Sequence, residues 1–127
     1  MIADIASLIN DLFTWRETLR GAQRDKRDRL ATYLQQIGTC LDDALTDLRS
    51  GGSAVRACGQ LRQYVDLIPP TIDEALGAER TDRLRQSLRA ALVVRFLNVR
   101  TDDQLNQLEE AAGAFIALAD YLRASPK

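Results

Sequence analysis

The sequence predicts an all-α protein, folded as an antiparallel helical bundle, and three observations support this. Apolar residues recur at alternating intervals of three and four, the repeat of a helix packed along its length against other helices. Aromatic residues make up only 6% of the chain, so a core of aliphatic side chains is expected. No segment alternates apolar and polar residues as a half-buried strand would. The two clearest apolar runs are Leu30, Leu34, Ile37, Leu41, Ala44 and Leu48, and Leu105, Leu108, Ala112, Phe115, Ala119 and Leu122.

The first part of the chain is expected to form one or two helices. A helix over Ile2–Arg20 would end at Gly21, because glycine costs about 1 kcal/mol in a helix interior. The alternative is one continuous helix, Ile2–Arg49, since the spacing of three and four runs on through Gln23 and Lys26. The sequence therefore predicts four main helices, or five if the first segment breaks near Gly21.

A loop and a pair of prolines delimit the middle of the chain. Ser50–Ser53 end the second helix and are too short to separate domains, so residues 1–127 are expected to form a single domain. The next helix, Ala54–Leu67, stops before Pro69-Pro70, because proline lacks an amide proton and restricts the residue before it. Thr71 is then expected to cap a short helix, as the first residue of a capping-box pattern.

Two longer helices are expected in the C-terminal part of the chain. The short helix is expected to stop at Gly77, and Thr81 would cap a helix over Asp82–Asn98. Apolar residues cover more than one face of that helix towards its end. Thr101 opens a second capping-box pattern, which starts the last helix, Asp102–Ala124.

The residue types present exclude several kinds of function. The chain has no histidine, which excludes Ser-His-Asp and Cys-His catalysis and metal sites that use histidine. If the helices that carry Cys40 and Cys58 form a hairpin around Ser50–Ser53, the two cysteines are offset by roughly 7 Å along the helix axes. That offset is unfavourable for a disulfide, so both are expected to be buried free thiols. Paired carboxylates such as Asp43 and Asp47 are interpreted as solvated residues. We therefore expect no enzyme, no cofactor and no bound metal.

Charge and hydropathy narrow the class of partner. A net charge of −1 gives no basic excess, so nucleic acid is disfavoured as a partner. No stretch approaches the ~20 apolar residues of a membrane span. The N-terminus carries Asp4 and lacks the basic segment of a secretory signal. A cytoplasmic location is the expectation.

A locally basic segment supplies the candidate binding residues. Arg16, Arg20 and Arg24 are spaced four apart, so they would line one face of a continuous helix, and Arg27 extends the run. Trp15 lies beside them, either as an interface anchor or at the rim of the core. We hypothesise that this basic stripe binds a protein partner with an acidic surface. Nucleic acid or anionic lipid on the same stripe is one alternative, and a merely solvated helix face is another.

Two further segments are candidates for contacts. Arg95 and Phe96 lie in an apolar stretch, which would form a docking patch if some of its side chains cannot reach the core. The last helix is rich in small residues, namely Ala111, Ala112, Gly113, Ala114, Ala117 and Ala119. Small residues let helices approach closely, either inside one chain or across the two-fold axis of a homodimer.

Several short segments of the sequence together resemble a known class of domain. The chain combines Trp15-Arg16, the charged run after it, Leu30-Ala31 with Tyr33-Leu34, Cys58 with Leu61, and Leu67-Ile68-Pro69. In this combination it resembles small helical adaptor domains of bacterial signalling and defence proteins. Leucine spacing of this kind is shared by many unrelated bundles, so the resemblance assigns no residue a role. The sequence thus predicts a non-catalytic adaptor or regulatory domain that binds protein, with a self-assembling helical module as a further alternative.

Overall fold

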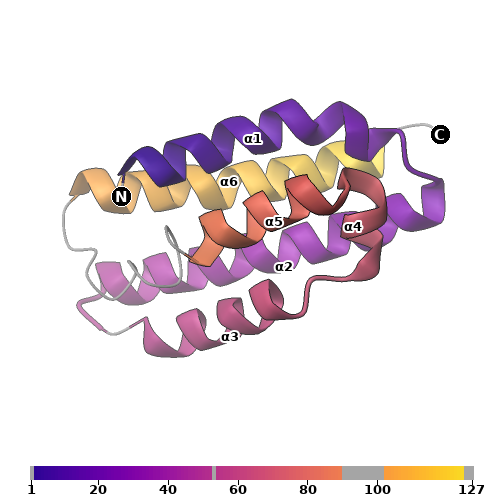
Figure 1. The fold of residues 1–127 in the computed structure, drawn as a ribbon. Coiled ribbons are helices and arrows are strands. Elements are labelled where there is room, and N and C mark those ends of the chain that lie inside the picture. The colour runs from indigo at the N-terminus through magenta and orange to yellow at the C-terminus, as the bar shows by residue number, and fades with distance from the viewer. Residues whose placement is uncertain (1, 53, 90–101, 125–127) are drawn as a thin grey trace.

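The computed structural model describes residues 2–52, 54–89 and 102–124, and these form an all-α bundle without a strand (Figure 1). The prediction of an all-α helical bundle is thus confirmed. The helices are α1 (Ile2–Arg20), α2 (Arg24–Arg49), α3 (Val55–Asp66), α4 (Pro70–Leu76), α5 (Ala78–Ser87) and α6 (Asp102–Ala124). No helix within these ranges is long and apolar enough to span a bilayer.

The long first segment is broken, so α1 and α2 are separate helices. At the break, the Gly21 amide donates to the Glu17 carbonyl at 3.1 Å. The chain then turns back, and α2 runs antiparallel to α1 (Figure 1). Lys26, which a continuous helix would carry along its apolar run, pairs instead with Glu74 of α4 at 2.9 Å. Of the two expectations for this segment, the break near Gly21 is therefore the one observed.

Two long helices, α2 and α6, form the centre of the bundle. They share the most extensive helix–helix contact and run in opposite directions (Figure 1). Helix α1 packs on α6 and runs parallel to it, whereas α3 packs on α2. Helices α4 and α5 contact each other and α1. As a result, the first and last helices of the described chain lie side by side.

The core follows the two predicted apolar runs. Every residue of the run on α2 is buried. The run on α6 is buried too, except for Leu105, which packs against its edge. At Gly38, α2 comes so close to α6 that a Cβ atom would lie 2.8 Å from Ile116 Cγ1 and 3.1 Å from the Ala112 carbonyl oxygen. Small residues of α6 therefore serve close packing inside this chain.

Two predicted helix caps are wrong. The N-cap of α4 is Pro69, in an extended conformation, and Thr71 lies inside the helix. Gly77, with a φ of 89°, ends α4 as predicted, but it also starts α5. Thr81 therefore lies inside α5, where it is buried and its hydroxyl donates to the Gly77 carbonyl at 2.9 Å. Because one glycine in the left-handed region makes the whole turn, no loop with a separate cap residue is needed.

Cys40 and Cys58 are both buried and free, as predicted. Burial raises the pKa of each thiol above its ordinary value. The thiolate is the form that attacks electrophiles and binds metals, so a thiol that resists ionisation is poorly reactive. Both cysteines act as small apolar residues of the core.

Candidate functional site

The predicted basic stripe does not form one continuous helix face. Arg16 and Arg20 lie on α1, but Arg24 is the first residue of α2, beyond the turn at Gly21. Arg20 is engaged within the chain, with Nη1 at 3.7 Å from Glu17 Oε2, and Arg24 is exposed to solvent. The prediction of a three-arginine face is therefore wrong, because it assumed a helix that the turn interrupts.

Trp15 is a core residue and not a surface anchor. Only 5% of its surface is exposed, and it lies between Leu12 and Leu19 on the buried side of α1. These three residues are spaced by three and four, so they form the inward face of the helix. Of the two expectations for Trp15, an interface anchor or a residue at the rim of the core, the structure shows a core position.

Arg27 is buried as well, at 2% exposure, and it contacts the end of α1. Its Nη1 donates to the Arg20 carbonyl at 3.5 Å, while its Nε has no partner. The last carbonyls of a helix lack partners within the helix and carry the negative end of its dipole, so a cation there is stabilised. Arg27 thus joins α2 to α1 inside the bundle, and the surface position expected for it in the basic stripe is wrong. Arg95 and Phe96 lie outside the described residues.

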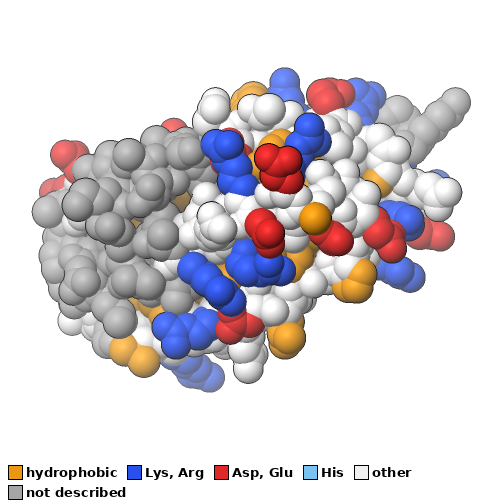
Figure 2. All heavy atoms as spheres, viewed as in Figure 1, with side chains coloured by type: hydrophobic (Ala, Val, Ile, Leu, Met, Phe, Trp, Pro, Cys, Tyr) orange, Lys and Arg blue, Asp and Glu red, His pale blue; other side chains and the backbone are white. Residues whose placement is uncertain are grey.

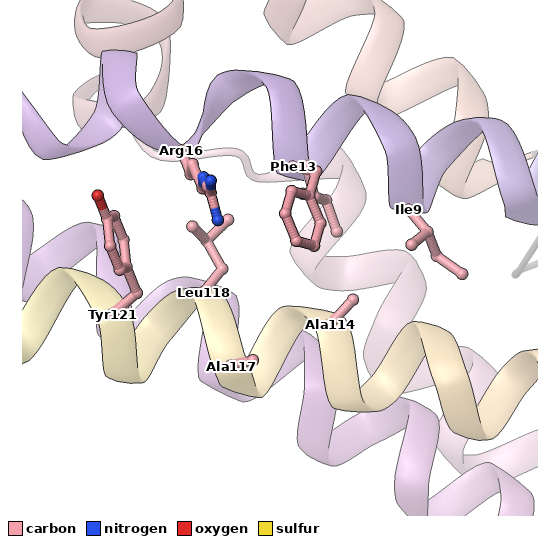
Figure 3. A pocket seen from close by; sticks show the side chains of 8 residues that line it. Ile9, Phe13, Arg16, Ala114, Ala117, Leu118 and Tyr121 are labelled. Carbon is pink, nitrogen blue, oxygen red and sulfur yellow. The ribbon is translucent and has the colours of Figure 1, made fainter.

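The parallel helices α1 and α6 leave an open groove between them, which we call the α1–α6 groove (Figure 3). Its volume is about 250 Å³. The lining residues are Ile9, Leu12, Phe13 and Arg16 from α1, and Ala114, Ala117, Leu118 and Tyr121 from α6. In Figure 3 the side chains of α1 descend towards α6, and the small side chains of Ala114 and Ala117 leave the space between them open.

Phe13 stands at the edge of this groove with 63% of its surface exposed. Its ring is covered on one side by Arg16, whose guanidinium carbon lies 4.6 Å from the ring centroid. The ring of Tyr121, from α6, flanks the same guanidinium at 5.8 Å. Aromatic residues and arginine are the residue types most enriched at protein interfaces, and here they meet beside an apolar hollow.

Hydrogen bonds hold the Tyr121 end of the groove. The Tyr121 hydroxyl donates to Glu17 Oε1 at 2.8 Å, and Arg20 Nη1 donates to the same hydroxyl at 3.4 Å. The charges of Glu17 and Arg20 offset each other in an ion pair. Arg16, by contrast, has no carboxylate partner within the described part of the chain. An uncompensated positive charge therefore lies at one end of an apolar groove.

A second hollow, between α1 and α5, has a different character. Glu79, Arg80, Asp82 and Arg83 line it, so charges of both signs meet there. Figure 2 shows acidic and basic side chains interspersed over the face that carries α5. A surface of this kind produces no single-sign field that would attract a charged partner. In the ranges that the structure describes, no group of three or more acidic or cysteine side chains is placed to hold a metal ion.

Comparison with known proteins does not identify the function of the groove. No protein-family model, curated protein or solved structure matches this chain. The residues of the α1–α6 groove therefore supply the evidence for a function.

The residues of this groove that sequence reasoning missed include both of its aromatic residues, Phe13 and Tyr121. Phe13 lies outside the spacing of three and four that buries Leu12 and Trp15, and that spacing indicates its exposure without deciding it. Tyr121 belongs to the other end of the sequence. Only the packing of α6 on α1 brings it next to Arg16.

Proposed function

We propose that this protein is a non-catalytic adaptor or regulatory domain, which binds one helix of a partner protein in the α1–α6 groove. The observation that carries the proposal is the exposed Phe13 ring at the edge of an apolar groove between two parallel helices. Apolar surface in water is unfavourable, and a partner that covers it recovers free energy. An amphipathic helix fits best, because two parallel helices offer a groove along which a third helix can lie.

The charge of Arg16 supports a partner with an acidic surface. Arg16 lines the groove and has no carboxylate partner within the described residues, whereas the charge of Arg20 is offset by Glu17. A charge beside an interface speeds the encounter with an oppositely charged partner and helps to fix its orientation. A helix whose apolar face is flanked by acidic residues therefore complements both the groove and its rim.

The chemistry of the chain supports binding rather than catalysis. The sequence offers no histidine as a general base. Burial raises the pKa of both thiols, so neither is activated as a nucleophile.

Site-specific photo-crosslinking tests this proposal. The photoreactive residue p-benzoylphenylalanine replaces Phe13 in one variant and Ala117 in a second, both in the groove. A third variant carries it at Arg62, which is exposed on α3 and serves as the matched control. Irradiation in cells of the native host should give the same protein adduct from both groove positions and none from the control.

A charge reversal makes the result specific. Adding Arg16→Glu to the variant that carries the photoreactive residue at position 13 should remove the adduct, because an acidic partner is then repelled. An equally strong adduct from position 62, or adducts with nucleic acid alone, would contradict the proposal.

A further inference from the structure

Arg16 is the charged residue among the apolar and aromatic residues that line the α1–α6 groove. Its side chain is half-buried, against the rings of Phe13 and Tyr121 at 4.6 Å and 5.8 Å. Other arginines that have no carboxylate partner among the described residues, such as Arg24 and Arg62, are exposed to water, which screens their charge. Arg16 is thus a partly dehydrated cation that no carboxylate of the described chain compensates.

The two aromatic contacts hold this cation in one place. A guanidinium stacked on rings keeps its outer edge free for hydrogen bonds, and that planar edge matches the two oxygens of a carboxylate. Arg16 follows Phe13 by three residues on α1, so the two positions are separated by about 4.5 Å along the helix axis. The groove therefore places an apolar contact and a cation about one helical turn apart.

We infer that the α1–α6 groove selects occupants in which a carboxylate lies about one helical turn from a bulky apolar group, with Arg16 receiving the carboxylate. In a partner helix, this pattern is an aspartate or glutamate three or four residues from an apolar anchor. The inference rests on the proposed function and adds to it the chemical rule by which the groove distinguishes its occupants.

Binding of a matched series of small molecules tests this rule without the partner. The series is 4-phenylbutyrate, 4-phenylbutanamide and 4-phenylbutylamine, which share one apolar group and differ in the charge of its polar end. Binding is followed through the methyl NMR signals of Ala114, Ala117 and Leu118, which line the groove. The proteins are the wild type, Arg16→Gln and, as the control, Arg62→Gln, which changes an exposed arginine on α3.

The carboxylate should bind the wild type roughly five- to tenfold more tightly than the amide, as expected for a charge-assisted hydrogen bond at a half-exposed site, and the amine should bind most weakly. Arg16→Gln should remove this preference and leave the affinity for the amide unchanged, while Arg62→Gln should keep the preference. The preference should also decline in roughly 1 M salt.

Three results would overturn the inference. These are equal binding of carboxylate and amide in the groove, a preference that survives Arg16→Gln, and the absence of any shift at the groove methyl groups. The first two leave the proposed function standing, since they show an occupied groove that ignores charge. The third removes the carboxylate rule, and the crosslinking experiment then decides separately whether a partner helix uses the groove.

Discussion

The hydroxyl of Tyr33 on α2 donates a 2.6 Å hydrogen bond to the backbone carbonyl of Tyr64 on α3. Helix α3 ends at Asp66, so this carbonyl is one of the last four, which have no partner within the helix. The two rings also meet edge to face, with centroids 6.3 Å apart and an interplanar angle of 83°. Tyr33 therefore caps α3 and fixes it to the central helix pair at once.

Replacing this hydroxyl should destabilise the protein. We expect Tyr33→Phe to lower the free energy of unfolding by about 1–3 kcal/mol, because the partly buried carbonyl of Tyr64 loses its donor. Urea denaturation measures the change. Tyr64→Phe is the matched control, since it removes a hydroxyl from the same ring pair without touching the bond, and it should cost less than about 0.5 kcal/mol. Equal losses in the two variants would contradict this role of Tyr33.

The same burial should make stability decrease at alkaline pH. Burial raises the pKa of Tyr33 above its ordinary value of 10.0, and those of Cys40 and Cys58 above 9.0. The unfolded chain releases these protons at the ordinary pKa while the folded protein retains them, so rising pH favours unfolding. The contribution should be complete below about pH 8 and decline from about pH 9 upwards. Urea denaturation measures the free energy of unfolding across this range. Above pH 10 it should decline less steeply with pH in Tyr33→Phe than in the wild type, and identical slopes would contradict a contribution from Tyr33.

A pair of glycine substitutions tests the close packing of α2 on α6. In Gly38→Ala the new Cβ would lie 2.8 Å from Ile116 Cγ1 and 3.2 Å from Phe115 Cβ, so we expect a loss of about 1–3 kcal/mol in stability. Gly113→Ala on α6 meets nothing within 4 Å and should stabilise the protein by about 0.5–1 kcal/mol, through helix propensity alone. Thermal unfolding measures both. A stabilising Gly38→Ala would show that the two helices are further apart.

Neighbouring aromatic residues of α1 should respond oppositely to truncation. Trp15 is 5% exposed, so Trp15→Ala should cost about 3–5 kcal/mol. Phe13 is 63% exposed, so Phe13→Ala should cost no more than about 1 kcal/mol, mainly through its contact with Arg16. Chemical denaturation of both variants checks this contrast. Similar losses would mean that the orientation of α1 differs from the one described.

The parts of the fold that the sequence predicted correctly are those in which one pattern extends over many residues. The apolar run of α2 spans five intervals without interruption, so its inward face is determined by local spacing alone. Gly77 likewise ends a helix by its own backbone freedom. Neither conclusion depends on where the other helices lie.

The sequence could not decide whether the helix breaks at Gly21, because the local cost of a glycine in a helix and the free energy of long-range contacts are of similar size. A glycine costs only about 1 kcal/mol inside a helix, which a favourable contact offsets. The contacts that favour the turn lie elsewhere, in the ion pair of Lys26 with Glu74 and the bond from Arg27 to the end of α1. In the sequence alone, Lys26 and Arg27 cannot be distinguished from charged residues on the surface.

The candidate site was missed for a related reason. Phe13 and Trp15 both lie next to the apolar face that Leu12 and Leu19 define, and spacing alone does not decide which of the two aromatic side chains is buried. The other wall of the groove comes from α6, and only tertiary packing brings Ala117 and Tyr121 to it. The sequence analysis selected Arg16 for its charge. The structure adds that its guanidinium lies against the rings of Phe13 and Tyr121, inside the groove.

Mapping the crosslink on the partner tests the central claim most directly. Mass spectrometry of the adduct from the photoreactive residue at position 13 identifies the partner residue that it contacts. The account predicts an apolar residue on a partner helix with an aspartate or glutamate three or four residues away. A contact on a basic segment, or on a second copy of this chain, would contradict it.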